Sequence, residues 1–510
     1  MVKLRGNKRK SKNWRLLKVA KNETNGITLI ALIITIVVLI ILATITISTL
    51  TGENGILNKA QEAMNKTNTA QIEEEKDLLK MESEINNSIG SYDVWNGTNS
   101  TEPTIKNGKE IYIYTCAELK WLADKVNSGE TFDNYTIYLM NNLDFGAKEE
   151  NGSWATENNE NVKWTPIGSS NNDNSYRLNA IFEGNSHIIK GVYVSNTNDF
   201  NGIFGNANTI KNLTIKDSYI EGADCTAGIV GALREGEISN CYVENTIIKG
   251  NDYTGGITGQ FTGSSISNCG SSANIISGGC AGGIVGRVVS NVEIEKCYNI
   301  GNINSSARTG GILGDSSSSI KVNISQSYNT GNILGNMYTG GIAGLIYGNI
   351  KNSYNSGSIS SSNNSGGTQA GGIVGDISGE GIGYNCYNIG KVIAPIEITY
   401  TSWSGGVAAC LSGGATMYNC YNYGEITAKY YGGAIGRLYG DSNAYDCYFL
   451  SSIASKGVQN NVQGTIENIT SKTSDEMNSN ILLQWLNNEE EIWKADNNNI
   501  NFGYPILSWQ

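Results

Sequence analysis

A short glycine motif returns through half of the chain and constrains its fold more than any other feature. Gly-Ile-Phe-Gly first appears at Gly202, and it recurs as Gly-Ile-x-Gly or a close variant at intervals of 26 to 34 residues. The copies begin at Gly202, Gly228, Gly256, Gly283, Gly311, Gly341, Gly372, Gly406 and Gly433. A period of this size indicates one supersecondary unit per copy, with each unit stacked on its neighbours.

Other positions keep the same register. A Cys-Tyr or Ser-Tyr pair follows most copies, and an aliphatic residue comes six residues after its first member, at Ile247, Ile275, Ile303, Ile333, Ile359, Val392 and Ile426. The units hold short β-branched runs separated by Gly, Asn and Ser, which favours strands and turns over helices. Coiling stacks equivalent residues at about 4.8 Å. One inward ladder is expected at Ile229, Ile257, Ile284, Ile312, Ile342 and Ile373, and a second at Ile238, Ile266, Ile294, Ile324 and Ile350.

The predicted fold is therefore all-β, a right-handed parallel β-helix (β-solenoid). An N-terminal transmembrane α-helix, a helical stalk and terminal capping helices complete it. The paired glycines of each repeat suit tight corners with positive φ, and the Asn-rich strand ends suit turns.

The repeat resembles a known family. Gly-Gly-Ile-Val-Gly followed by Cys-Tyr-Asn-x-Gly-x-Ile is similar to the GLUG repeat of bacterial cell-surface proteins. The resemblance covers residues 201–455 and implies a surface-exposed β-solenoid. It does not imply an enzyme.

Charge is unevenly distributed along the chain. Residues 1–26 contain nine basic residues and one acidic residue, so they carry +8 of a total net charge of −11. The remaining chain therefore carries −19. An acidic body argues against binding nucleic acid through its phosphates.

An apolar run follows the basic leader. Residues 27–47 contain no charged side chain, which is long enough for a helix across a bilayer core of about 30 Å. We expect residues 27–50 to span the membrane and contact its lipid, with residues 1–26 kept in the cytoplasm by their positive charge. The polar, helix-favouring residues 51–90 would form a stalk. The expected location is the cell membrane, single-pass, with an extracellular ectodomain.

The junction between leader and apolar run resembles a type IV prepilin leader. The matching residues are Asn25-Gly26-Ile27-Thr28-Leu29-Ile30. The resemblance implies that a prepilin peptidase cuts between Gly26 and Ile27 and that Ile27 becomes N-methylated. Ala31 stands where that family usually has a Glu that neutralises a neighbouring subunit's amino terminus. Association with pilin subunits in a filament and a plain membrane anchor are both open alternatives.

The segments that flank the repeats are expected to close the solenoid, since terminal repeats need capping. Residues 91–200 would form the N-terminal cap and the first coils. Within them, Thr115 and Glu118 form a capping-box signature at the start of an amphipathic helix. Residues 456–510 would form the C-terminal cap, with a helix over 474–491.

The chain has ten cysteines and one histidine. Six cysteines share one repeat position with Ser218, Ser327 and Ser353, namely Cys241, Cys269, Cys297, Cys386, Cys420 and Cys447. Cysteine alternating with serine indicates a small buried residue. Disulfides between stacked cysteines remain geometrically open. The spacing predicts no metal site, and His187 is interpreted as a structural turn residue.

The sequence gives little support for catalysis. The residue after each Gly-Ile-x-Gly varies freely, which suits an outward position. It includes Asp315 and Asp376, two coils apart with Leu345 between them, and this is a poor carboxylate pair for hydrolysis. Arg287 and Asp315, one coil apart, are expected to form a surface ion pair. We predict no catalytic residue and no cofactor.

Two sets of aromatic residues are candidates for binding. A tyrosine recurs in register at Tyr242, Tyr298, Tyr328, Tyr354, Tyr387, Tyr421 and Tyr448, where it would stack sugars, dock a protein or simply pack inward or in the turns. Trp403, Tyr430 and Tyr431 are expected in loops and are the freer ligand-contact candidates. The predicted function is adhesion to a surface glycan or protein. A cell-surface polysaccharide lyase or hydrolase and a minor type IV pilin subunit are the alternatives.

Overall fold

The computed structural model describes residues 92–510 except for residues 96, 98, 147–162, 170–175, 363–366, 398–401, 479 and 488–490. The predicted leader, transmembrane helix and stalk, with the cleavage position between Gly26 and Ile27, lie outside the described residues. No helix within the described part of the chain is long and apolar enough to cross a membrane.

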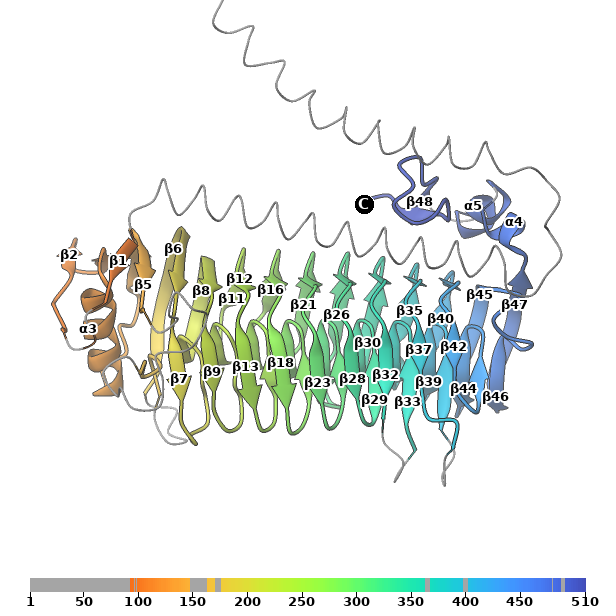
Figure 1. Ribbon diagram of the computed structural model, residues 1–510, viewed down its shortest axis with the longest axis horizontal. Coiled ribbons are helices and arrows are strands. Elements are labelled where there is room, and N and C mark those ends of the chain that lie inside the picture. The colour runs from red at the N-terminus through yellow and green to blue at the C-terminus, as the bar shows by residue number, and fades with distance from the viewer. Residues whose placement is uncertain are drawn as a thin grey trace, which may run out of the picture. The chain divides into compact units, whose positions relative to one another are not determined.

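Parallel strands wind into successive coils that form one solenoid (Figure 1). Each repeat supplies five short strands, and each strand pairs with the equivalent strand of the coils before and after it. One coil consists of β10 (Val230–Leu233), β11 (Glu237–Ser239), β12 (Tyr242–Glu244), β13 (Ile247–Gly250) and β14 (Thr254–Gly255). The predicted parallel β-solenoid is confirmed.

The first two strand positions follow the Gly-Ile-x-Gly corner. The first position holds β10, β15 (Thr258–Phe261), β20 (Val285–Val288), β25 (Leu313–Ser316), β30 (Ala343–Lys351), β34 (Val374–Ser378), β39 (Ala408–Ser412), β44 (Ile435–Tyr439) and β46 (Val458–Val462). The second holds β11, β16 (Ser265–Ser267), β21 (Val292–Glu295), β26 (Val322–Ser325), the end of β30, β35 (Ile382–Tyr384), β40 (Thr416–Tyr418), β45 (Asn443–Leu450) and β47 (Thr465–Lys472).

The third position carries the Tyr-Asn pairs. It holds β12, β17 (Gly270–Ser271), β22 (Tyr298–Asn299), β27 (Tyr328–Asn329), β31 (Tyr354–Asn355), β36 (Tyr387–Asn388), β41 (Tyr421–Asn422) and the end of β45. Long strands such as β8 (Phe204–Lys216) pass through several positions and link the first three into one 31-stranded sheet.

The last two positions form separate sheets. The nine-stranded sheet holds β7 (Tyr193–Ser195), β9 (Tyr219–Glu221), β13, β18 (Asn274–Ser277), β23 (Ile303–Ser305), β28 (Ile333–Gly335), β32 (Ile359–Ser361), β37 (Val392–Ile393) and β42 (Ile426–Thr427). The seven-stranded sheet holds β14, β19 (Ala281–Gly282), β24 (Thr309–Gly310), β29 (Tyr338–Gly340), β33 (Gln369–Gly371), β38 (Trp403–Gly405) and β43 (Tyr431–Gly432).

Stacked isoleucines fill the interior, as predicted. The backbone N–H of Ile257 donates to Ile284 O at 3.0 Å, and that of Ile284 donates to Ile312 O at 3.2 Å. All members of the first predicted ladder are fully buried. The second ladder is in direct register, with Ile266 opposite both Ile238 and Ile294. Burying such a column stabilises each coil by about 2 kcal/mol per isoleucine.

The third aliphatic position has one correction. Ile275 pairs with Ile303, and the column continues through Ile333, but Ile275 is opposite Ile248 rather than Ile247. The segment from Val243 to Ile248 is one residue longer than the paired segment from Ser271 to Ile275, and it contains Asn245 in the left-handed region at φ 43°. The extra residue shifts the register by one, so Ile248 enters the core instead.

The expectation about the paired glycines is also corrected. The glycines of the Gly-Gly corners do not have positive φ. A Cβ on Gly283 would instead overlap the carbonyl oxygen of Gly311 in the next coil, so these corners need glycine because adjacent backbones approach closely. Among the described residues, half of the non-glycine residues with positive φ are asparagines, and five of these directly precede the Cys or Ser position, such as Asn240 and Asn268 at φ 52°.

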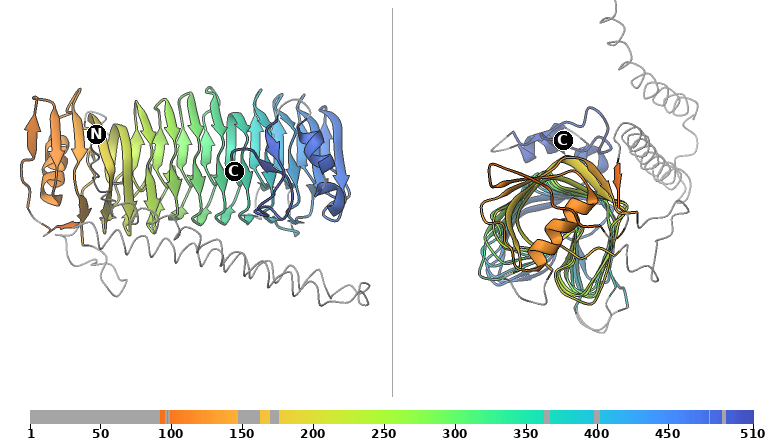
Figure 2. Two further views of the ribbon diagram at one scale, coloured as in Figure 1. Left: turned by 90° about the horizontal axis from the view of Figure 1, so that it is seen from above. Right: turned by 90° about the vertical axis from the view of Figure 1, so that its left-hand side faces the viewer.

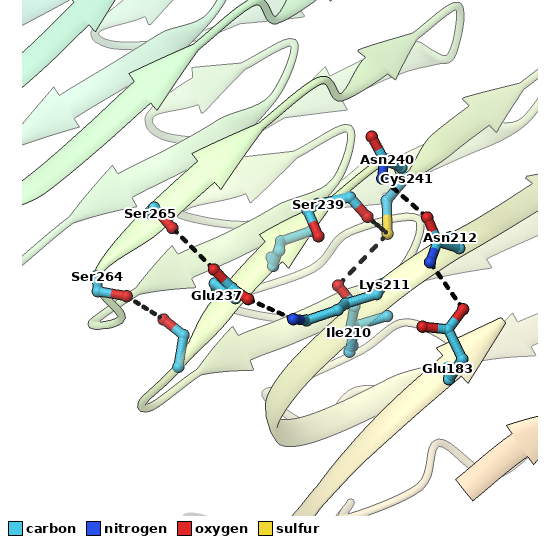
Figure 3. A network of polar contacts seen from close by, with 12 residues as sticks. Glu183, Ile210, Lys211, Asn212, Glu237, Ser239, Asn240, Cys241, Ser264 and Ser265 are labelled. Carbon is cyan, nitrogen blue, oxygen red and sulfur yellow. Dashed lines mark hydrogen bonds and ion pairs between the residues drawn. The ribbon is translucent and has the colours of Figure 1, made fainter. Parts of the chain in front are cut away.

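The six repeat cysteines point into the core. Cys241 is fully buried, and its Sγ lies 3.3 Å from Ser239 O and 3.6 Å from Ile210 O (Figure 3). Outside it, Asn240 donates a side-chain hydrogen bond to Asn212 at 2.8 Å. All ten cysteines are buried and free, and burial raises the pKa of Cys241 well above its ordinary value. They pack as thiols.

A helix covers the N-terminal end of the solenoid (Figure 2). It is α3 (Cys116–Asn127), and it begins with the predicted capping box between Thr115 and Glu118. Leu119 and Leu122 are among its fully buried residues. The first strands beside it are β1 (Tyr92–Val94), β2 (Thr104–Lys106), β3 (Glu110–Ile113), β4 (Thr136–Leu139), β5 (Asn142–Asp144) and β6 (Leu178–Lys190).

The C-terminal segment differs from the predicted end cap. Residues 458–472 form the last coil as β46 and β47. The expected single helix over 474–491 is two short helices, α4 (Ser474–Met477) and α5 (Asn480–Leu486), followed by β48 (Trp493–Lys494) and β49 (Ile506–Leu507). These elements pack against the outward tyrosines of the third strand position, on the side of the solenoid (Figure 1).

Candidate binding surface

The register aligns the variable residue after each Gly-Ile-x-Gly into one column. The expected exposure of this position is wrong for most of the column, because Ala232, Asp315, Leu345, Asp376 and Cys410 are buried. Arg287 is opposite Gln260 on one side and Asp315 on the other. Farther along, Asp376 is opposite Leu345 and Cys410, and Cys410 is opposite Arg437. We call this set the corner column: Ala232, Gln260, Arg287, Asp315, Leu345, Asp376, Cys410 and Arg437.

A second column runs beside it, at the start of the fifth strand position. Tyr338 is opposite Gln369, and Gln369 is opposite Trp403. We call this set the turn column: Tyr253, Cys280, Arg308, Tyr338, Gln369, Trp403 and Tyr430. The two columns touch at several coils. For example, Arg287 donates to the hydroxyl of Tyr253 at 2.6 Å. We call the two columns together the strip.

Asp315 lies in the middle of the strip and is 3% exposed. Arg308 Nη1 is 2.9 Å from its Oδ2, and Arg287 Nε is 3.9 Å from the same oxygen. The predicted Arg287–Asp315 pair is therefore present, but it is not a surface pair, and Arg308 is the closer partner. Burial raises the pKa of Asp315 although both arginines oppose the shift. The Asp315 carboxylate therefore forms a buried structural ion pair with these arginines.

Asp376 is 6% exposed and has a different environment. The hydroxyl of Ser412 donates to its carboxylate at 3.1 Å. Burial raises the pKa of Asp376 to about 7 from an ordinary value of 3.8, while Ser412 and Arg437 favour the ionised form. Leu345, itself nearly buried, lies between Asp376 and the coil of Asp315. The two carboxylates do not share an open groove, which hydrolysis by a carboxylate pair requires.

The structure brings together two of the three predicted ligand-contact residues. Trp403 and Tyr430 are half-buried, with ring centroids 5.6 Å apart and an interplanar angle of 43°. Tyr431 is the next residue, and it packs instead against the cluster of Ala370 and Ile426. Successive strand side chains point to opposite faces, so Tyr430 and Tyr431 cannot both serve the strip.

Two cations complete this end of the strip. The Arg437 guanidinium lies 6.0 Å from the Trp403 ring centroid and 4.5 Å from that of Tyr439. Lys429 Nζ lies 5.6 Å from the Tyr430 ring centroid. We call these five residues, Trp403, Lys429, Tyr430, Arg437 and Tyr439, the aromatic patch. The sequence reasoning missed Lys429 and the role of Arg437, although the register of both repeat motifs places Arg437 one coil from the Trp403 position.

The tyrosine column is an aromatic surface of a different kind. Successive rings such as Tyr328, Tyr354 and Tyr387 stack at 5.1 Å. Tyr387, Tyr421 and Tyr448 are buried beneath the C-terminal segment, where they pack against Trp493, Leu482 and other apolar residues. Trp509 covers Tyr328 and Tyr354. These tyrosines therefore hold the C-terminal segment, in keeping with the packing interpretation of the column.

A shallow groove of about 380 Å³ lies on the outside of the nine-stranded sheet. Its lining is neutral and includes Asn302, Asn304, Asn332 and Leu334. Within the described residues, no group of three or more His, Cys, Asp or Glu side chains is placed to hold a metal ion.

Comparisons with known proteins agree with the repeat. A family model described as the GLUG motif matches residues 335–360, the segment from β28 to β32. No curated protein matches the chain. A solved structure titled as that of a "putative immunoglobulin A1 protease from Bacteroides ovatus" is 18% identical, with a TM-score of 0.41, over 81% of this chain and 96% of that chain. The chain thus carries the GLUG motif on a β-solenoid.

Proposed function

We propose that this chain is a membrane-anchored, pilin-like cell-surface protein whose right-handed β-helix ectodomain mediates adhesion to a glycan or a protein. The observation that carries the proposal is the aromatic patch, in which Trp403 and Tyr430 form an accessible pair beside Arg437. Aromatic and arginine side chains are enriched at recognition surfaces because they combine apolar contact area with polar ends. The GLUG motif in residues 335–360 supports a surface role.

Binding to a glycan array and to an array of cell-surface proteins tests the adhesive role. The double variant Trp403→Ala/Tyr430→Ala should lose at least about tenfold in affinity, since each stacked aromatic contributes about 1 kcal/mol or more at an interface. Tyr112→Ala is the matched control, because Tyr112 belongs to a similar half-exposed pair with Tyr138, 5.2 Å away in the first coils. Equal loss in both proteins, or none in either, would reject the aromatic patch as the binding site.

The membrane-anchoring part of the proposal has its own test. A prepilin peptidase would cut between Gly26 and Ile27 and leave an N-methylated Ile27 at the start of the mature chain. N-terminal sequencing of the native protein should then begin at Ile27. An intact leader would remove the pilin-like processing. Shearing filaments from cells and searching them for this chain would test the alternative of a minor pilin subunit.

A second candidate function, polysaccharide cleavage, has one favourable observation. Asp376 has a pKa of about 7 and lies one coil from Cys410 in the corner column, so it would be poised to exchange a proton near neutral pH. Release of shorter products from a bound polysaccharide, abolished by Asp376→Asn, would favour this function. Binding without product release favours adhesion.

A further inference from the structure

Among the described residues, several cations on the solenoid are paired with acids, but the two cations of the aromatic patch are not. Lys211 pairs with Glu237, and Lys216 lies 3.6 Å from Glu244. Arg437 and Lys429, in contrast, form no ion pair with any of the residues that the structure describes. Both lie against aromatic rings instead. In a chain that carries −19 outside its leader, two cations without ion pairs, one at each ring of the Trp403–Tyr430 pair, are a local positive site.

Arg437 also retains an unused hydrogen-bond donor. Its Nε is buried and, among the described residues, has no hydrogen-bond partner. This buried nitrogen is closed to a ligand, so a ligand would be contacted by the Nη groups of this half-buried side chain. A guanidinium offers two parallel N–H donors, and the acceptor that matches them is a carboxylate.

The groups around Arg437 do not cancel its charge. Asp376 is the nearest acidic residue in the corner column, and burial brings its pKa to about 7, so it is only partly ionised at neutral pH. Cys410 lies opposite Arg437, and burial raises its pKa as well, so it stays neutral. Neither neighbour therefore fully neutralises the charge of Arg437.

We infer that the aromatic patch binds a sugar ring that carries a carboxylate, as in a uronic acid or a sialic acid. The inference rests on the adhesive function proposed above and names its ligand class. The apolar C–H face of the ring would pack on Trp403 and Tyr430, and the carboxylate would accept hydrogen bonds from Arg437, with Lys429 adding charge attraction. An extended acidic peptide fits less well, because the patch offers a single two-ring platform rather than a sheet edge with free backbone groups.

The test compares acidic with neutral glycans on the full-length chain. The probes are oligogalacturonate, sialyllactose and lactose, measured by surface plasmon resonance at low and moderate salt. We expect an acidic probe to bind at least about tenfold more tightly than lactose, with a preference that weakens as salt rises. Which acidic probe binds distinguishes a uronate from a sialate. Preference for lactose, for a sulfated glycan without carboxylate or for an acidic peptide would overturn the inference.

Variants separate this inference from the proposed function. Arg437→Gln should lower the affinity for the acidic probe by about tenfold and so remove its preference over lactose. Lys429→Gln, at an exposed position where folding is not at risk, should reduce the preference less. Lys211→Gln, in the distant Lys211–Glu237 pair, is the control and should have no effect. If Trp403→Ala abolishes binding but Arg437→Gln leaves the preference intact, the carboxylate assignment is wrong and the adhesive function stands.

Discussion

A buried column of asparagines offers the sharpest test of how the coils hold together. The column is formed by the residue after each tyrosine: Asn299, Asn329, Asn355, Asn388 and Asn422. All five are fully buried. Each side-chain amide donates to the asparagine of the next coil at 2.7–2.8 Å as far as Asn422, and also to the carbonyl of the glycine two residues later. We predict that Asn355→Ala strongly destabilises the solenoid.

The contacts of Asn355 set the expected magnitude. Its Nδ2 donates to Gly357 O at 2.9 Å and to Asn388 Oδ1 at 2.8 Å, and its Oδ1 accepts from Asn329 Nδ2 at 2.7 Å and from Gly357 N at 3.2 Å. Asn329 and Asn388 each keep a bond to the glycine of their own turn, but Gly357 N–H loses its acceptor. Two to three buried groups left short of a partner, at about 1–2 kcal/mol each, lower the free energy of unfolding by about 3–5 kcal/mol.

Urea unfolding followed by circular dichroism measures the loss, and hydrogen exchange of the Gly357 amide locates it. The matched control is Asn304→Ala, since Asn304 is an exposed asparagine on β23 and should change stability by less than about 0.5 kcal/mol. Equal midpoints for the two variants would refute the reasoning. So would an Asn355→Ala chain that leaves the exchange of Gly357 unchanged, because the lost hydrogen bond would then have protected nothing.

Three further predictions concern the core, the strip and the C-terminal segment. Ile312→Ala should lower the free energy of unfolding by about 3 kcal/mol because it opens a cavity in the ladder, while Ile276→Ala, at a position 40% exposed, should cost under about 1 kcal/mol in the same urea titration. Asp376→Asn should stabilise the chain by up to about 4 kcal/mol above pH 7. Because burial raises the pKa of Asp376 in the folded chain, the unsubstituted chain loses stability as the pH rises from about 4 to about 7. The stability advantage of Asp376→Asn should therefore vanish near pH 4 in a series of unfolding curves. Trp509→Ala removes the ring over Tyr354 and the Nε1 bond to Asn352 O, so hydrogen exchange should quicken in residues 492–510 and not around Ile312.

The isoleucine ladders were predictable because they follow from the spacing of the repeats alone. Parallel coils stack equivalent positions, so a repeated isoleucine must face its own copy, as Ile257, Ile284 and Ile312 do. The capping box of Thr115 and Glu118 was predictable for a similar reason, since it depends on residues three apart in one segment. Period and local spacing therefore determine most of the architecture.

Features that depend on backbone geometry between coils were not predictable. The corner glycines were expected to need positive φ, but they are required because a Cβ on Gly283 would overlap the backbone of the next coil. The one-residue shift from Ile247 to Ile248 follows from the longer turn at Asn245, which the six-residue spacing concealed. The packing of residues 474–510 against the side of the solenoid depends on the tertiary contacts of the tyrosine column.

The candidate site combines features that the sequence predicts with features that it does not. Trp403 and Tyr430 occupy one column of the fifth strand position, and their separation of 27 residues equals one repeat, so their proximity was implicit in the sequence. The position of Arg437 beside these two residues could be inferred only once the path of the chain around the Gly-Gly corner was known. The separate roles of Tyr430 and Tyr431 followed only once the strand direction was known.

The division between inward and outward columns explains where specificity can reside in this fold. Several inward positions repeat one kind of residue, here isoleucine, asparagine or cysteine and serine, because each must fit copies about 4.8 Å above and below. The corner column is free of that restriction, and it accordingly varies from Arg287 to Asp315 to Leu345. A ligand that approaches the strip therefore meets different chemistry at each coil. The position of a binding site along the solenoid is set by single outward substitutions, and the aromatic patch is the place where several of them coincide.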